Sequence, residues 1–208
     1  MTPVLSSAVD KCTCKSIRHG RLFVISAPSG AGKTTLCNAL LKCCRTLAYS
    51  VSHTTRKPRK GERNGTDYHF ITEAEFRKMI ERDAWVEWAH VHGNYYGTSR
   101  EAIEHHLQQG RDILLDVDVQ GARQIVERTP EAVTIFIAPP SLAALKERLI
   151  HRGTDDAETI ARRLAEAENE MRQMGEYTHV VVNEDRKEAT AELMTLIQSY
   201  GGCPGGEL

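Results

Sequence analysis

The stretch Ser-Ala-Pro-Ser-Gly-Ala-Gly-Lys-Thr-Thr at residues 26–35 follows directly on the apolar run 21–25, Arg-Leu-Phe-Val-Ile. This order favours a strand that enters a glycine-containing turn and then opens a helix. The N–H groups of such a turn and of the first helical turn form a concave site for an anion. Lys33 adds a mobile positive charge, and the Thr34 hydroxyl is a ligand for a divalent cation. The stretch therefore predicts a phosphate-binding loop.

One position departs from the usual pattern of such loops, G-x-x-x-x-G-K-[ST]. Ala27 stands five residues before Gly32, where the pattern has glycine. Glycine is required there only if the backbone has a positive φ. We therefore keep the phosphate-binding interpretation, with an ordinary strand–turn–helix carrying an incidental Gly-Lys pair as the alternative.

The remaining chain alternates short apolar runs with amphipathic helical stretches. Further strands are expected at 112–118, 132–138 and 179–183, and helices at 33–47, 119–128, 141–152, 157–174 and 187–199. Alternating strands and helices imply a mostly parallel sheet with helices on both faces. The expected fold class is α/β.

Residues 50–98 interrupt this alternation. Their first part is polar, basic and turn-rich, whereas 84–98 has the short alternating pattern of antiparallel strands. Between them, Thr72 and Glu75 form a capping box that predicts a short helix to about Arg82. Because an unstructured loop of this length is uncommon, we expect a small antiparallel insertion on the parallel core.

Composition places the chain among globular proteins. Of its 208 residues, 40% are hydrophobic and 26% charged, and the formal net charge of −1 gives no reason to expect nucleic acid or a membrane surface as partner. No apolar run approaches the roughly 20 residues of a membrane span. The six cysteines lack zinc-site spacing, and residues 1–18 read as a flexible leader without a secretory signal. We therefore expect reduced thiols and a cytoplasmic location.

Two clusters suggest how phosphate groups are handled. The strand at 112–118 ends in Asp116 and Asp118, which could position a metal or water, with a polar strand end as the alternative. Arg56, Arg59 and Tyr68 lie in the basic part of the insertion, where guanidinium groups can bind phosphate through two parallel hydrogen bonds. A solvated basic loop is the alternative for this second cluster.

Glu87 lies between apolar residues in the run Trp-Val-Glu-Trp, and Tyr96 and Thr98 follow shortly after it. A carboxylate in a pocket can accept hydrogen bonds from N1–H and N2–H of guanine, an edge that adenine does not offer. Discrimination of this kind can be large, because the wrong base leaves a buried group unpaired. Glu87 is therefore a candidate for recognising a guanine base.

Arginines gather around the junction of the two helices at 141–152 and 157–174, namely Arg148, Arg152, Arg162 and Arg163. On a mobile flap they could close over a transferring phosphoryl group and exclude water from it. Solvated arginines on an amphipathic helix are the alternative.

Together these motifs resemble the guanylate kinases, and specifically the bacterial type. The resemblance covers about residues 20–199 and rests on separate runs in the same order: SAPSGAGKTTL, SVSHTTRKPRKGERNGTDYHF, EW at 87–88, GNYYGTSREAI, ILLDVDVQGA, RGTDDAETIARRL and VVVNED. The family also uses alanine at the start of the phosphate-binding loop, which accounts for Ala27. The resemblance implies the reaction ATP + GMP ⇌ ADP + GDP with Mg²⁺, in guanine nucleotide metabolism.

The resemblance also implies a role for each matching position. The ATP site would comprise Ala27, Pro28, Ser29, Gly30, Ala31, Gly32, Lys33, Thr34, Thr35, Arg148 and Asn183, with Thr34 as the metal ligand and Asn183 near the adenine. The GMP phosphate would be held by Arg56, Arg59, Tyr68 and Tyr96, and the guanine by Ser52, Glu87 and Thr98, with Asp116 close by. The residues that would act on the transferring charge are Lys33, Arg59, Arg152 and Arg163, helped by Arg148.

The implied organisation is a leader at 1–18 and a kinase domain at 19–200. The domain would have a core at 19–52 and 99–200, a GMP-binding insertion at 53–98 and a lid at 151–163. Glu184 stands where the family more often has aspartate, and we assign it no role. The expected partners are GMP and ATP, and the sequence leaves a homo-oligomer open.

Two rival functions remain. A non-catalytic guanylate-kinase-like binding module would have no need of Lys33, Thr34 and the arginines of the lid. A kinase for another phosphate ester, such as a ribose bisphosphate, would have no need of Ser52, Glu87 and Thr98 together.

Overall fold

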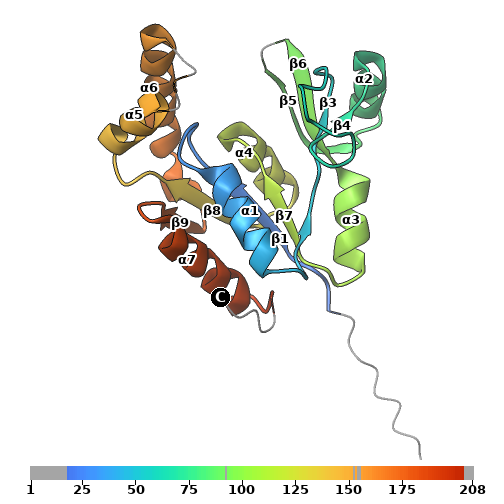
Figure 1. The fold of residues 1–208 in the computed structure, drawn as a ribbon. Helices are drawn as coiled ribbons and strands as arrows, with labels where there is room; N and C mark the ends of the chain where they lie inside the picture. Colours follow the sequence, from blue (N-terminus) through green and yellow to red (C-terminus); the bar gives the residue numbers. More distant parts are fainter. Residues whose placement is uncertain (1–17, 92, 152, 154–155, 204–208) are drawn as a thin grey trace, which may run out of the picture.

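The computed structural model describes residues 18–91, 93–151, 153 and 156–203. Its core is a five-stranded sheet in the order β2-β7-β1-β8-β9 (Figure 1). The strands are β1 (Leu22–Ser26), β2 (Ala48–Tyr49), β7 (Ile113–Asp116), β8 (Val133–Ala138) and β9 (His179–Val182). All neighbouring pairs in this sheet are parallel. The predicted parallel α/β core is confirmed.

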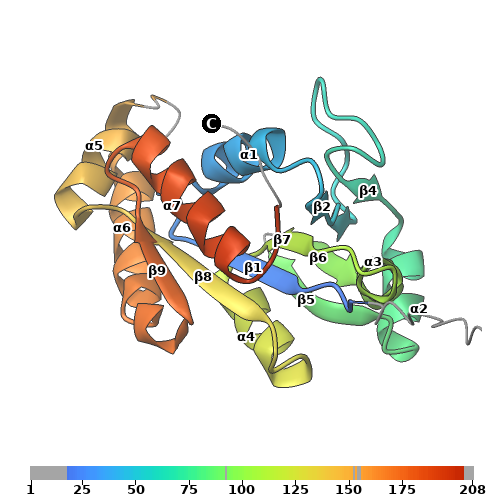
Figure 2. The same ribbon diagram turned by 90° about the horizontal axis from the view of Figure 1, so that it is seen from below.

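Helices cover both faces of this sheet (Figure 2). They are α1 (Lys33–Cys43) and α7 (Arg186–Ser199) on one face, and α3 (Arg100–Gln108) and α4 (Val119–Arg128) on the other. The central strand β1 is buried on both sides, which explains its unbroken apolar sequence. Its side chains alternate, with Phe23 and Ile25 facing α1 and α7 and with Leu22 and Val24 facing the opposite side.

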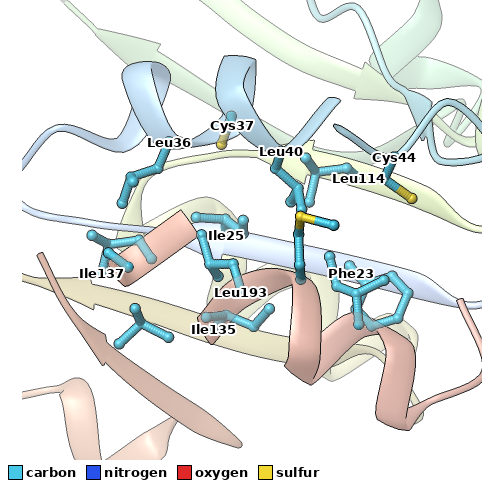
Figure 3. Close-up of a cluster of buried hydrophobic side chains, with 14 of the residues drawn as sticks. Phe23, Ile25, Leu36, Cys37, Leu40, Cys44, Leu114, Ile135, Ile137 and Leu193 are labelled. Carbon is cyan, nitrogen blue, oxygen red and sulfur yellow. The ribbon is translucent and has the colours of Figure 1, made fainter. Parts of the chain in front are cut away.

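The main buried cluster lies between β1, α1 and α7 (Figure 3). Ile25, Leu36, Leu40 and Leu193 are each fully buried in it. A side chain of this kind contributes roughly 1.5–3 kcal/mol when it is fully removed from water. This packing fixes the start of α1, and hence the loop before it, against the sheet.

A second sheet, in the order β4-β3-β6-β5, stands apart from the core (Figure 1). Its strands are β3 (His53–Thr54), β4 (His69–Phe70), β5 (Trp85–Val91) and β6 (Asn94–Ser99), and α2 (Glu73–Glu81) accompanies them. The pairs β3–β6 and β5–β6 are antiparallel as expected, whereas β3 and β4 run parallel. The capping box of Thr72 and Glu75 is present at the start of α2, as predicted.

A pair of helices, α5 (Leu142–His151) and α6 (Ala157–Met171), stands on the opposite side of the core from the second sheet (Figures 1 and 2). The two helices pack on each other through Leu145, Leu149 and Ala167, all fully buried. Arg152, predicted to act on the transferring phosphoryl group, lies outside the described residues.

Several element boundaries differ from the sequence-based expectation. The helix α1 ends at Cys43 instead of Leu47, because the chain must turn to pair the short edge strand β2 with β7. The helix α6 ends at Met171, and a separate 3-10 turn covers Met174–Glu176. Neither β2 nor α3 was expected. The helix α3 is short and buries a single residue, Ile103, with Leu107 packed beside it one turn later.

The expectation of reduced thiols is wrong for two cysteines. Cys44 and Cys203 form a disulfide across 159 residues, whereas Cys37 and Cys43 are free. Within the described residues, no group of three or more His, Cys, Asp or Glu side chains could hold a metal ion. No helix in that part of the chain combines the length and apolarity needed to cross a membrane.

Candidate active site

The loop between β1 and α1 carries glycine where its backbone requires it. Gly30 and Gly32 have φ values of 94° and 93°, in the left-handed region. Among the described non-glycine residues, only Asp83 and Cys203 have a positive φ, so Ala27 does not. Alanine at this position therefore introduces no backbone strain into the loop.

Asn183 supports this loop from behind. It follows β9, is only 7% exposed, and donates a hydrogen bond from Nδ2 to the carbonyl oxygen of Ala31 at 2.7 Å. A Cβ atom on Gly32 would come within 2.5 Å of that same nitrogen. Arg148 in turn donates to the carbonyl oxygen of Asn183 at 2.8 Å. The side chain of Asn183 is thus engaged with the loop, and its expected position near adenine stays a prediction.

A cavity lies over the loop. It is lined by Ala27, Pro28, Ser29, Gly30, Gly32, Lys33, Thr34, Thr35, Asp118 and Glu170. Most of the predicted ATP-binding residues therefore face one space. Ala31 is the exception within the loop, because it is fully buried.

Glu170 was not predicted from the sequence. It lies on α6 and lines the loop cavity together with Asp118. Burial, reinforced by the negative charges of Asp118 and Glu166, raises the pKa of Glu170 to about 7, and Lys33 partly opposes this shift. A single carboxylate on an amphipathic helix carries no motif, so no signal in the sequence could have identified it.

Asp118 has a structural role in addition to its place in the cavity. It is the N-cap of α4 and accepts a hydrogen bond from the backbone N–H of Gly121 at 2.7 Å. Such a bond satisfies one of the unpaired donors at a helix start. The carboxylate is thereby fixed at the carboxyl end of β7, beside the loop.

A second cavity lies between the core and the second sheet. It is lined by Lys33, Ser52, Tyr68, Glu87, Ala89, Val91, Tyr96, Gly97, Asp116, Val117 and Asp118. The structure thus brings together five of the predicted GMP-binding residues, Ser52, Tyr68, Glu87, Tyr96 and Asp116.

Glu87 is the most deeply buried carboxylate of this cavity, with 6% of its surface exposed. The Thr98 hydroxyl, fully buried on β6, donates a hydrogen bond to Oε1 of Glu87 at 2.5 Å. Burial raises the pKa of Glu87 to about 7. The Thr98 bond and the charge of Lys33 act against this shift, and the charge of Asp118 adds to it. The carboxyl is therefore about half ionised at neutral pH, and it is fully available as a hydrogen-bond acceptor only at higher pH.

The two arginines predicted to hold the GMP phosphate lie outside the lining of this cavity. Arg56 binds both carboxylate oxygens of Glu62, at 3.0 and 2.8 Å, and lies over the Tyr68 ring, 5.5 Å from its centroid. The backbone N–H of Arg59 donates to the same carboxylate at 2.7 Å, and the residue is exposed. Glu62 therefore organises this loop at the edge of the cavity that Tyr68 lines.

Lys33 connects the two cavities. Its Nζ lies 2.5 Å from Oδ1 of Asp116 and donates to the carbonyl oxygen of Val117 at 2.6 Å. Lys33 and Asp118 line both the loop cavity and the second cavity. A group bound in one space therefore meets a group bound in the other beside Lys33.

Of the arginines expected to act on the transferring charge, Arg148 and Arg163 lie on the helix pair, on α5 and α6 respectively. Arg148 donates to the carbonyl oxygens of Asn183 and Glu184, which ties α5 to the end of β9. Arg162 is exposed beside Glu166, at 3.9 Å, an arrangement that contributes little energy.

Comparisons with known proteins agree with this arrangement. The guanylate kinase family model matches residues 19–200. The guanylate kinase of Dechloromonas aromatica (strain RCB) is 49% identical over 182 residues, covering 88% of this chain and 90% of the relative. The guanylate kinase of Shewanella sp. (strain MR-7) is 52% identical over 182 residues, covering 87% and 88%.

A solved structure shares the fold. The crystal structure of guanylate kinase from Anaplasma phagocytophilum superposes with a TM-score of 0.70 at 34% identity, covering 88% of this chain and 86% of that one. Taken with the glycine-containing loop and the buried carboxylate facing it across a shared lysine, these matches show that the chain belongs to the guanylate kinase family.

Proposed function

We propose that this chain transfers the γ-phosphoryl group of ATP to GMP, according to ATP + GMP ⇌ ADP + GDP. The observation that carries the proposal is the position of Lys33, which lines both the loop cavity and the cavity of Glu87. Donor and acceptor phosphates bound in the two spaces would meet at this lysine. The relatives named guanylate kinase support the same assignment of substrates.

Guanine recognition is assigned to Glu87, Thr98 and Ser52. An ionised Glu87 would accept the N1–H and N2–H donors of guanine, while the Thr98 hydroxyl holds the carboxylate in place. Adenine presents no such pair of donors, and it would leave the buried carboxylate without partners. The cavity would therefore select the base through one charged group.

The acceptor phosphate is assigned to Tyr68, Tyr96, Arg56 and Arg59. The two tyrosines line the cavity, and Arg56 lies over the ring of Tyr68. Since Arg56 is paired with Glu62, a bound phosphate would compete with that carboxylate for the guanidinium group. Asp116 would release Lys33 as the phosphates of both substrates arrive.

The nucleophile is already an anionic phosphate oxygen, so the reaction needs no general base. Catalysis would consist of positioning the two nucleotides and stabilising the charge that develops between them. Lys33 would supply a positive charge at the transferring group. We assign Arg152 and Arg163 to the lid that closes over it and excludes water, with Arg148 helping from α5.

The loop cavity has the donors that Mg²⁺ prefers. The Thr34 hydroxyl is exposed in the first turn of α1, and the carboxylate of Asp118 faces the same space. Hard oxygen ligands of this kind, completed by phosphate oxygens and water, are typical of magnesium sites. When bound, the ion would neutralise charge on the β- and γ-phosphates. Thr34 is the residue we expect to ligate it.

The same proposal divides the chain into the core at 19–52 and 99–200, the GMP-binding insertion at 53–98 and the lid at 151–163. The second sheet, which supplies Glu87 and Thr98, lies within 53–99. A cytoplasmic location, where both nucleotides are available, belongs to this proposal. The proposal does not include an oligomeric state.

An acceptor panel tests the function. ADP release would be measured with GMP, AMP, UMP and a ribose phosphate as alternative acceptors, and GMP should be turned over far faster than the others. Glu87→Gln should reduce this preference while leaving the KM for ATP nearly unchanged. GMP binding without turnover would favour the binding module, and preference for the ribose phosphate would favour the other kinase class.

A further inference from the structure

Cys44 and Cys203 lie at the ends of the two helices that cover one face of the core. Cys44 is the C-cap of α1, whose first turn belongs to the phosphate-binding loop, and Cys203 follows the end of α7. Figure 3 shows Cys44 at the end of α1, beside the main buried cluster. The Cα atoms of the two cysteines are 5.4 Å apart, within the range of a disulfide.

The chain after α7 is shaped to bring Cys203 to this place. Gly201, with φ of 80°, donates to the carbonyl oxygen of Gln198, and Gly202 donates to that of Ile197, which together terminate the helix in a tight turn. A Cβ atom on Gly202 would come within 2.8 Å of both Ile197 and Asp112. There is therefore no room at position 202 for a residue other than glycine. The turn leads the chain to Cys203, beside Cys44 at the end of α1.

Cys203 itself has an unfavourable backbone conformation. Cys203 has φ of 48°, a left-handed conformation that non-glycine residues rarely adopt. Its side chain is 5% exposed, and that of Cys44 is 2% exposed. Beside them, Asp112 accepts two hydrogen bonds from Arg18 and one from the backbone N–H of Arg21. The disulfide thus closes a junction between the two ends of the described chain.

We propose that Cys44 and Cys203 are a reversible redox pair that fastens the turn at 200–203 to α1 in the oxidised protein. In the oxidation, the two thiols lose two protons and two electrons and form one S–S bond. A small-molecule disulfide accepts them and is cleaved to two thiols. Because both sulfurs are buried, exchange requires the turn at 200–203 to open. The bond makes stability depend on the redox state of the solution.

The other described cysteines, Cys37 and Cys43, are not part of this pair. Burial raises the pKa of Cys37 to about 12, so this thiol is an unreactive part of the core. Cys43 is partly buried and unpaired, next to Cys44 in the chain. It is therefore a matched control for its neighbour.

The pair lies at the far end of α1 from Lys33, roughly 16 Å along the helix axis for its 11 residues. Oxidation should for this reason change kcat less than twofold. The inference does not depend on the proposed substrates, and its readouts are covalent structure and thermal stability.

Peptide mapping without reductant tests the bond. After equilibration of the full chain with oxidised glutathione, trypsin should release residues 43–45 linked to residues 188–208. Cys43→Ser should retain this linkage, whereas Cys44→Ser and Cys203→Ser should lose it. Absence of the linked peptide from the oxidised wild type, or its loss in Cys43→Ser, would overturn the proposal.

Thermal unfolding tests whether the bond makes the stability of the protein depend on the redox state of the solution. Oxidised wild type should unfold about 5 °C or more above the same protein in dithiothreitol. Cys203→Ser should match reduced wild type under both conditions, and Cys43→Ser should respond as wild type does. A redox-dependent shift of equal size in Cys203→Ser would reject the pair as its source. Cys203 lies at the end of the described chain. If Cys44→Ser does not fold, Cys203→Ser can therefore be used as the test variant in its place.

Discussion

The Nζ of Lys33 lies 2.5 Å from Oδ1 of Asp116. The lysine of the phosphate-binding loop is thus paired with a carboxylate of the neighbouring cavity, and it also donates to the carbonyl oxygen of Val117. Donor phosphates must compete with these acceptors for the lysine. This link between the two cavities makes Lys33 the first residue to test.

We expect Lys33→Met to lower kcat by about 10²–10³-fold or more, because it removes the positive charge at the transferring group. The KM for GMP should change little, since Glu87 and Thr98 are unaltered. Steady-state ADP release measures both. Lys78→Met, which removes an exposed lysine from α2, is the matched control. Turnover close to that of wild type would reject the assigned role of the loop.

Binding of GMP should depend on pH through Glu87. Burial raises the pKa of this carboxyl to about 7, so the free protein loses its ionised acceptor as pH falls through 7. The KM for GMP should then rise, approaching tenfold per pH unit below 7, while the KM for ATP stays nearly constant. In Glu87→Gln this dependence should disappear, apart from the ionisation of the GMP phosphate near pH 6. A KM profile that is the same in both proteins would exclude Glu87 as the titrating group.

The same carboxyl should lower stability at alkaline pH. A folded-state pKa of about 7, above the ordinary 4.5, stabilises the fold below pH 4.5, and this contribution is lost as pH rises to 7. At pH 8 the ionised group costs roughly 3 kcal/mol, an order-of-magnitude figure from the pKa difference.

Glu87→Gln should therefore gain stability relative to wild type between pH 5 and pH 8, as measured by urea unfolding at each pH. Glu104→Gln, an exposed position on α3, should show no such gain. If the difference in unfolding free energy between Glu87→Gln and wild type does not change with pH, burial does not perturb the pKa of this carboxyl.

The parts of the fold that the sequence predicted are those with a regular pattern or a short motif. The continuous apolar run of β1, the loop after it, and the capping box of Thr72 each depend on neighbouring residues. The edge strand β2 has two residues, too few for a recognisable period, and α3 spans only Arg100–Gln108, directly after β6.

What the sequence could not predict depends on residues that approach one another in space. Glu170 reaches the loop cavity from α6, and Asn183 supports Ala31 from 152 positions away. The pairing of Cys44 with Cys203 is of the same kind, because the connectivity of cysteines cannot be read from their spacing. Glu87 could be predicted as a site residue because the apolar residues on either side of it in the sequence indicate that its side chain is buried.

Gly32 should be intolerant of a side chain. Its φ of 93° is unfavourable for alanine, and the added Cβ would lie 2.5 Å from Nδ2 of Asn183, which holds the carbonyl oxygen of Ala31. Gly32→Ala should therefore distort the loop, lower kcat/KM for ATP by more than about tenfold, and cost about 1–3 kcal/mol of stability.

The control for Gly32→Ala is Gly175→Ala, where the added Cβ meets nothing within 4 Å. Both variants would be compared by urea unfolding and by ATP dependence of turnover. If close contact with Asn183 is part of the cost, Asn183→Ala in the Gly32→Ala background should lose less activity than it does in wild type, since the loop support is already broken. Strict additivity of the two losses would show that Gly32 is required for its backbone conformation alone.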